Sequence, residues 1–213
     1  MSGLTGPEAR DAVTRLALYD GEVIVDAPPG YCIDQSHVRR GGDGAVVPLA
    51  TCASLTGKAG VPVPSALMTV SVLPRQGVQA TPTSDSIAAS MAPAEVLERA
   101  DEGGVSYVRF AEGGENALPG GDPRHWRGGM VINGHLVGLA VYAPSGSALA
   151  GAEGRRLMAD LAARLRRASP ELPAQPTDEA AAGAEGADTP DETDAAQGRG
   201  LRGLLGGLFR DSG

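Results

Sequence analysis

The pattern of apolar and polar positions along the chain predicts a succession of short strands. The clearest case is Leu67 to Leu73, in which Thr69 and Ser71 alternate with apolar residues. Such a period of two is typical of strands, because successive side chains point to opposite faces of a sheet. Pro48 lies inside another β-rich run and favours an edge position or a bulge there. The predicted strands cover residues 22–26, 31–33, 45–55, 67–73, 105–110, 126–132 and 135–142.

The last two predicted strands are expected to form a hairpin. Asn133-Gly134 stands between two apolar runs, and this dipeptide favours the two-residue turns that join antiparallel strands. We therefore expect residues 126–132 and 135–142 to pair directly.

Three segments are predicted to be helices. Residues 8–19 carry acidic residues near their start and helically spaced apolar residues after them, and residues 93–100 open with a proline. Residues 149–168 form the longest helix, because Leu157, Leu161 and Leu165 make one apolar stripe. The order of all these elements favours an α+β fold, a mostly antiparallel sheet with helices packed on one side of it.

The composition divides the chain into three regions. Between Glu171 and Gln197 there are eight acidic residues and no Lys or Arg, and few large apolar side chains. Such a segment buries too little apolar surface to offset the entropy of ordering. We predict a single α+β domain over residues 1–169, a disordered acidic linker over residues 170–198 and an amphipathic peptide over residues 199–213.

Three of these features together resemble the Mog1/PsbP-type α+β domains. They are an early strand followed by Pro-Pro-Gly-Tyr at residues 28–31, a late hairpin that contains Trp126 and ends in Val-Gly-Leu-Ala-Val-Tyr at residues 137–142, and a closing amphipathic helix. The resemblance covers residues 20–168 and is one of element order. It implies an α+β sandwich that serves as a non-catalytic binding or assembly factor.

The C-terminal peptide is the sharpest functional signal. Its apolar residues have the i, i+3, i+4, i+7, i+8 spacing of one helix face, and Arg199, Arg202 and Arg210 flank them. Five glycines between residues 198 and 207 disfavour a free helix, so we expect the peptide to order only on a surface. That surface is either an anionic membrane or a groove on a partner protein, with docking on its own domain or simple fraying as the alternatives. The predicted docking residues are Leu201, Arg202, Leu204, Leu205, Leu208, Phe209 and Arg210.

Cys32 and Cys52 lie on two extended segments that a Gly-rich turn separates. If these segments pair, the cysteines would form a disulfide typical of an oxidising compartment. The alternative is a pair of reduced, buried thiols.

The residues with catalytic potential do not form a recognised motif. Asp34 and His37 have the spacing to share one face of a turn, so a carboxylate would orient that imidazole. The segment Arg124-His125-Trp126-Arg127 is a second candidate, either as a recognition cluster or as a core tryptophan with arginine stems beside it. We therefore expect a non-catalytic binding or accessory protein without a cofactor or metal, and keep as alternative a small enzyme that uses Asp34, His37 and residues 125–127.

Charge and hydropathy limit the partners and the location. Residues 1–170 hold 17 acidic and 15 basic residues, so the domain lacks the basic face of a nucleic-acid-binding protein. Of the 18 basic residues, 17 are Arg, which with abundant Ala and Gly indicates a GC-rich bacterial genome. No signal-peptide pattern opens the chain, so we expect a cytoplasmic protein, peripheral to the inner membrane through its C-terminal peptide, or a periplasmic one if a signal precedes this sequence.

Overall fold

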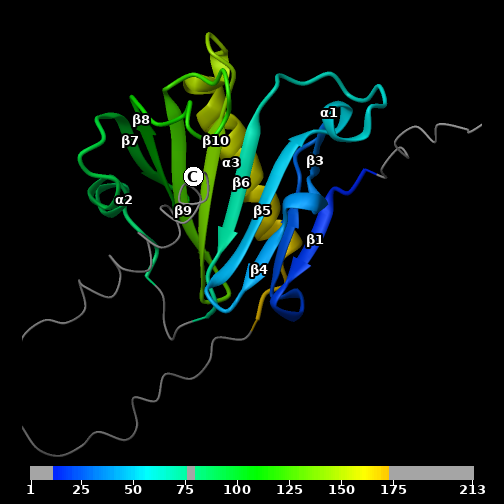
Figure 1. The fold of residues 1–213 in the computed structure, drawn as a ribbon. Coiled ribbons are helices and arrows are strands. Elements are labelled where there is room, and N and C mark those ends of the chain that lie inside the picture. The colour runs from blue at the N-terminus through cyan, green and yellow to red at the C-terminus, as the bar shows by residue number, and fades with distance from the viewer. Residues whose placement is uncertain (1–11, 76–79, 173–213) are drawn as a thin grey trace, which may run out of the picture.

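The computed structural model describes residues 12–75 and 80–172, and these residues form an α+β fold built on a large antiparallel sheet (Figure 1). The sheet has the strand order β3-β5-β6-β10-β9-β8-β7, and β4 pairs with the first residues of β5. A separate two-stranded sheet joins β1 to β2. The strands are β1 Arg15–Leu18, β2 Val23–Asp26, β3 Tyr31–Ile33, β4 Arg39–Gly41, β5 Gly44–Thr51, β6 Leu67–Val72, β7 Val96–Glu102, β8 Val105–Phe110, β9 His125–Ile132 and β10 His135–Tyr142. The α-helices are α1 Cys52–Thr56, α2 Ser84–Ser90 and α3 Ala152–Ala168, and the 3-10 turns are η1 Tyr19–Gly21, η2 Gln35–His37 and η3 Ala148–Ala150.

The centre of the sheet is the predicted hairpin. Strands β9 and β10 pair from His135 opposite Ile132 to Val141 opposite Trp126. Asn133 and Gly134 both have positive φ, 52° and 77°, as the tight turn between twisted strands requires. The prediction from the Asn-Gly dipeptide is therefore confirmed.

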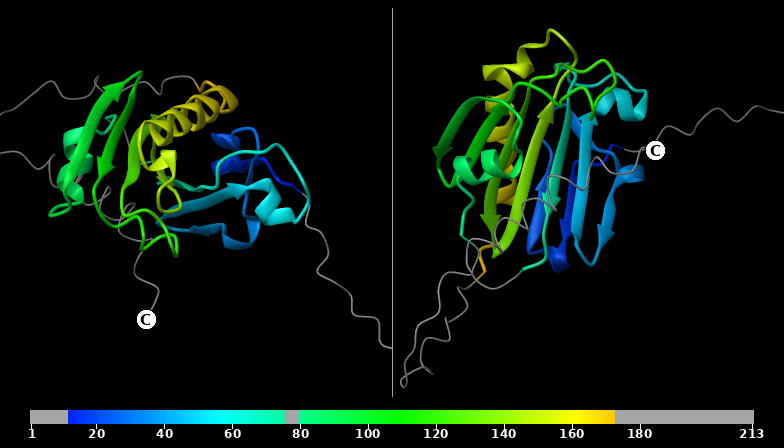
Figure 2. Two further views of the ribbon diagram at one scale, coloured as in Figure 1. Left: turned by 90° about the horizontal axis from the view of Figure 1, so that it is seen from above. Right: turned by 60° about the vertical axis from the view of Figure 1, so that its left-hand side comes forward.

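Helix α3 and the β1–β2 hairpin cover one face of the sheet (Figures 1 and 2). Met158, Leu161 and Leu165 of α3 are fully buried against this face. Alternate residues of the strands point toward them, for example Met68, Val70 and Val72 of β6. This side holds the larger of two apolar clusters and forms the main core.

The opposite face carries α2, so the expectation that helices lie on one side is wrong. Ile87 and Ala88 of α2 pack against Val108, Phe110 and Leu136 in a second, smaller cluster. Strands β8 to β10 are therefore buried on both faces. An alternation of apolar and polar residues in the sequence would indicate burial on one face only. Helix α2 packs on β7, β8 and β9.

Two predicted helices are wrong in the part that the structure describes. Within 8–19, residues Arg15–Leu18 form β1, which pairs with β2 through the turn at Asp20-Gly21. Within 93–100, the chain enters β7, which pairs with β8 at the edge of the sheet. In both cases a nearby partner strand outweighs a weak helical spacing. The short helix α2 was not predicted, whereas α3 fits the predicted 149–168 closely.

Apart from residues 170–172, the predicted linker and the predicted C-terminal peptide lie outside the described residues. Among residues 12–75 and 80–172, no helix is long and apolar enough to cross a membrane.

Candidate functional site

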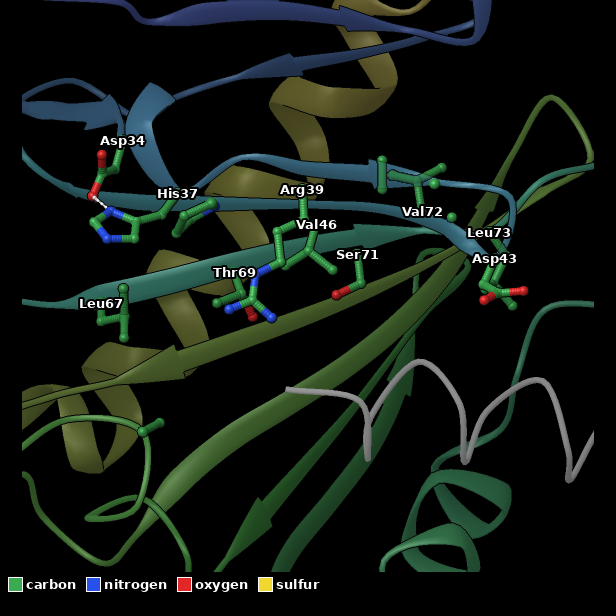
Figure 3. Close-up of a pocket in the computed structure, with 15 residues that line it drawn as sticks. Asp34, His37, Arg39, Asp43, Val46, Leu67, Thr69, Ser71, Val72 and Leu73 are labelled. Carbon is green, nitrogen blue, oxygen red and sulfur yellow. Dashed lines mark hydrogen bonds and ion pairs between the residues drawn. The ribbon is translucent and has the colours of Figure 1, made fainter. Parts of the chain in front are cut away.

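A pocket of about 530 Å³ lies on the face of the sheet opposite α3, over β4, β5 and β6 (Figure 3). The alternation of the strands builds its floor: Val46 pairs with Ser71 and Pro48 pairs with Thr69, so all four side chains point the same way. Their neighbours Val47, Met68 and Val70 point into the main core. The lining residues are Asp34, His37, Arg39, Gly41, Asp43, Gly44, Ala45, Val46, Pro48, Leu67, Thr69, Ser71, Val72, Leu73 and Ala117.

One end of the pocket carries the predicted pair Asp34 and His37. The Asp34 carboxylate lies 2.6 Å from Nδ1 of His37 and accepts hydrogen bonds from the backbone N–H and the hydroxyl of Ser36. Burial acts to raise the pKa of Asp34, but the bonds from Ser36 and His37 outweigh it and hold this pKa below its ordinary value. The sequence placed these two residues on one face of a turn, and the structure brings them together, with Asp34 as the cap residue before η2 and His37 as its last residue.

The pair leaves Nε2 of His37 turned away from its carboxylate partner. A carboxylate on Nδ1 fixes the imidazole in the tautomer that can accept a proton at Nε2. In the described part of the chain, no hydroxyl or thiol is hydrogen-bonded to that nitrogen. The Ser36 hydroxyl lies on the Nδ1 side, 3.1 Å away, where it cannot act as a nucleophile that Nε2 activates.

The other end of the pocket is formed by the β4–β5 turn and the end of β6. Asp43 lies in that turn, and Leu73 lies just beyond β6 (Figure 3). Between the two ends, Arg39 stands opposite Val46 in the β4–β5 register and therefore projects over the pocket face. The pocket thus has a largely apolar floor, a carboxylate at each end and a cation between them.

The structure separates the four residues of the predicted recognition cluster. Trp126 is fully buried in the main core, where its Nε1–H donates to the Gly151 carbonyl at 2.8 Å. His125 and Arg127 point to the opposite face, because they alternate with Trp126 along β9. Arg124 precedes the strand and binds the carboxylate of Asp122 through two bonds of 2.9 Å. These residues share no single surface.

Asp122 fastens the loop that precedes β9. Its carboxylate also accepts from the backbone N–H groups of Arg124 and Gly146, at 3.0 and 3.2 Å. The hydrogen bonds from the Arg124 side chain lower the pKa of Asp122 to about 2 despite its burial. The same loop carries Ala117, which lines the pocket.

His125 is a buried histidine that the structure keeps neutral. Its ring is stacked between Phe110 and Tyr142, with ring centres 5.6 and 5.3 Å away, and its Nδ1 lies 3.3 Å from the Pro123 carbonyl. Burial, with a smaller contribution from the positive charge of Arg127, lowers its pKa to about 4. This environment leaves no room for a hydrated imidazolium.

We expect the domain to lose stability as the pH falls from about 6.5 to 4. In this window the unfolded chain protonates His125 and the folded chain does not, so protons favour unfolding. The loss from this residue is on the order of 3 kcal/mol and levels off below pH 4. Urea unfolding at pH 7.5, 6 and 4.5 measures it, and His125→Leu should flatten the slope over this range. An unchanged slope in His125→Leu would assign the acid sensitivity to other groups.

Cys32 and Cys52 are joined in a disulfide, with Cα atoms 4.8 Å apart. Cys32 lies in β3 and Cys52 at the start of α1, directly after β5. The disulfide closes the segment that holds Asp34, His37, Arg39 and Asp43. It therefore fixes one wall of the pocket.

The sequence had pointed to the Asp34–His37 end of the pocket but not to Arg39, Asp43, Thr69 and Ser71. The signal for the last two was present, since two hydroxyl side chains alternate with core residues along the best predicted strand. Among the residues that the structure describes, no group of three or more His, Cys, Asp or Glu side chains is placed to hold a metal ion.

Comparison with known proteins gives one weak similarity. No family model matches the chain, and no curated protein matches it. Among solved structures, the chain is similar to a mutant of the protein Mog1, with a TM-score of 0.41 and 12% identity, over 72% of this chain and 92% of that chain. The weak Mog1-like resemblance of the α+β fold is thus shown, and it concerns the fold alone.

Proposed function

We propose that this protein is a non-catalytic binding or accessory protein that uses the pocket over β4–β6 to hold a partner. The observation that carries the proposal is the composition of the pocket. Binding sites are typically concave and mostly apolar, with a few charged or polar groups that fix orientation. The floor formed by Val46, Pro48 and Leu67 and the charged groups at Asp34, Arg39 and Asp43 follow that pattern.

The proposal also includes a tether. We propose that residues 199–210 dock on an anionic membrane surface, where the leucines and Phe209 enter the interface and the three arginines face the lipid head groups. A groove on a partner protein is the alternative docking surface for the same residues.

Sedimentation with lipid vesicles tests the tether. The full chain should bind vesicles that contain phosphatidylglycerol, and binding should weaken severalfold between 50 and 300 mM salt because the arginines are screened. Leu204→Asp with Leu208→Asp should abolish binding, whereas Val61→Asp, at a residue that is 62% exposed and outside the pocket, should not change it. Equal binding of the parent and the double variant would refute the tether.

A second candidate function follows from the Asp34–His37 pair. An oriented imidazole at the end of a pocket is the arrangement of a general base, so a small hydrolytic activity is the alternative. Turnover of p-nitrophenyl esters by the full chain, lost in His37→Gln and retained in Val61→Asp, would favour this enzyme over the binding protein.

The disulfide supports an oxidising location as part of the same proposal. Disulfides persist in compartments such as the periplasm and are rare in the cytoplasm. Alkylation of intact cells with a thiol reagent, followed by mass spectrometry, should find Cys32 and Cys52 unmodified. Modification of both residues in unreduced samples would favour a cytoplasmic protein.

A further inference from the structure

We infer that the pocket over β4–β6 is the docking site for residues 199–210 of the same chain, which fill it when the peptide is not held elsewhere. This inference deepens the proposed function, because it assigns an occupant to the pocket and makes the pocket and the tether mutually exclusive.

The described chain ends at the β9–β10 turn, near the end of the sheet that carries Leu73 of the pocket. The Leu172 N–H donates to Oδ1 of Asn133 at 3.4 Å, and the Asn133 amide donates to the Pro170 carbonyl at 2.8 Å. Two residues after Asn133, Nδ1 of His135 lies 2.8 Å from the carbonyl oxygen of Leu73, which lines the pocket. The Asn133 amide also donates to the Glu22 carbonyl of the β1–β2 hairpin, so the described chain ends on the α3 side of the sheet, at the end of the sheet where Leu73 and Asp43 lie. From there the peptide would have to pass around the end of the sheet to reach the pocket.

The chain beyond this point is long enough for its last segment to return. Residues 173–198 provide 26 residues, and a flexible linker of that length has a root-mean-square span of about 28 Å. A short tether of this kind gives the attached peptide an effective concentration on the order of 1 mM at the pocket. A peptide that binds with a dissociation constant of about 0.1 mM would then be docked about 90% of the time.

The length of the peptide fits the pocket. The floor runs along β6 from Leu67 to Leu73, which spans about 20 Å in an extended strand. A helix from Arg199 to Arg210 is about 16 Å long. The apolar stripe of Leu201, Leu204, Leu205, Leu208 and Phe209 would then lie on the apolar floor.

The charges of the pocket and of the peptide are opposite in sign at both ends. The pocket has Asp34 at one end and Asp43 at the other, and Asp34 stays ionised because Ser36 and His37 donate to it. The peptide has arginines at both ends of its apolar stripe, Arg199 and Arg202 before most of it and Arg210 after it. The pocket cation Arg39 lies between the two carboxylates, where the peptide presents apolar residues.

Because the peptide cannot occupy the pocket and a membrane at once, the two states compete. In the docked state, the pocket is closed to other partners and the apolar stripe is hidden. Binding of the peptide to a membrane surface would open the pocket. The protein would thus expose its pocket only where residues 199–210 are bound to a membrane surface.

The test uses the full chain and a fluorescein-labelled synthetic peptide of residues 199–213, followed by fluorescence anisotropy. The full chain with Leu204→Asp and Leu208→Asp has an open pocket and should bind the peptide with a dissociation constant near 0.1 mM. The parent should bind it about tenfold more weakly, since its own tail fills the pocket. Equal affinity for both chains, or none for the double variant, would overturn the inference.

Pocket variants in the same double-variant chain locate the contact. Val46→Asp places a charge on the floor and should abolish peptide binding, and Asp43→Arg reverses the charge at the rim and should weaken it about tenfold. Val61→Asp is the matched control, outside the pocket, and should have no effect. Val46 is half-buried, so a thermal unfolding scan checks its folding; Asp43 is exposed and keeps the test valid if Val46→Asp fails to fold. Full binding to Asp43→Arg, and to any folded Val46→Asp, would place the peptide elsewhere and overturn the inference.

Two further measurements distinguish this inference from docking on a second copy of the chain and from the proposed membrane tether. A parent chain that dimerises with rising concentration, while the double variant stays monomeric, would make the occupant a second copy and overturn docking within one chain. Failure of vesicle binding with intact peptide docking would remove the proposed tether and leave the pocket assignment standing. Vesicle binding without peptide docking would overturn the pocket assignment and leave the proposed tether standing.

Discussion

Removal of the Cys32–Cys52 disulfide is expected to lower the free energy of unfolding by about 3 kcal/mol, because an open loop of this length gives the unfolded chain more conformational entropy. The two cysteines are 20 residues apart. Strand β3 pairs with β5 through only three residues, Tyr31 to Ile33, so the disulfide reinforces a short ladder. For a domain of this size the midpoint of thermal unfolding should fall by roughly 6–12 °C.

Thermal unfolding of the parent with and without a phosphine reductant measures this effect. The variant with Cys32→Ala and Cys52→Ala should unfold at the temperature of the reduced parent and should not respond to the reductant. The arrangement of the pocket residues should change on reduction as well, since Asp34, His37, Arg39 and Asp43 all lie between the cysteines. An oxidised and a reduced parent with the same midpoint would show that β3 and β5 are held by pairing alone.

The parts of the fold that the sequence predicted are those with a strong local cause. The Asn133-Gly134 dipeptide specifies its hairpin because few other residues accept two consecutive positive φ angles. Strand β6 and helix α3 follow from unbroken periods of two and of about four residues. In each case one segment carries the whole signal.

The two segments that were wrongly predicted to be helices lack such a signal. Strand β1 has four residues, too few to distinguish a period of two from a helical spacing. Strand β7 lies at the edge of the sheet with most of its side chains at least partly exposed, so its sequence Val-Leu-Glu-Arg-Ala-Asp-Glu carries no alternation of apolar residues. Their pairing with β2 and β8 decides their conformation, and pairing is not visible within one segment.

The candidate site was predictable only where it is local. Asp34 and His37 are three residues apart, and their spacing predicted that they share one face of a turn. The structure places the Asp34 carboxylate 2.6 Å from Nδ1 of His37. The rest of the pocket depends on the order of β4, β5 and β6, which places Arg39 beside Val46 and Val46 beside Ser71. Sequence spacing does not determine that order, since β6 pairs on its other side with β10, 63 residues or more along the chain.

The predicted recognition cluster shows how one strand can mislead. Arg124, His125, Trp126 and Arg127 look like a dense polar and aromatic patch in the sequence. In β9 they alternate between two faces, so the tryptophan enters one core while His125 and Arg127 enter the other side. A stability measurement on Trp126 distinguishes the two interpretations directly.

Trp126→Ala is expected to destabilise the domain by about 4 kcal/mol, because it leaves a large cavity in the main core and a carbonyl without its donor. The side chain is 0% exposed and its Nε1–H donates to Gly151. Its surroundings are tight: a Cβ added at Gly154 would lie 2.7 Å from the indole Cδ1. The start of α3 cannot settle into the cavity without losing its own contacts.

Urea unfolding at pH 7.5 measures the effect, with Trp126→Phe as the matched variant. Phenylalanine keeps most of the apolar volume and removes the hydrogen bond, so its loss should be about 1–2 kcal/mol. Binding of the labelled peptide to the open-pocket chain should be the same with Trp126→Phe, since the pocket lies on the opposite face. A Trp126→Ala chain that keeps its stability but loses peptide binding would instead make Trp126 a recognition residue, as its arginine and histidine neighbours in the sequence suggested.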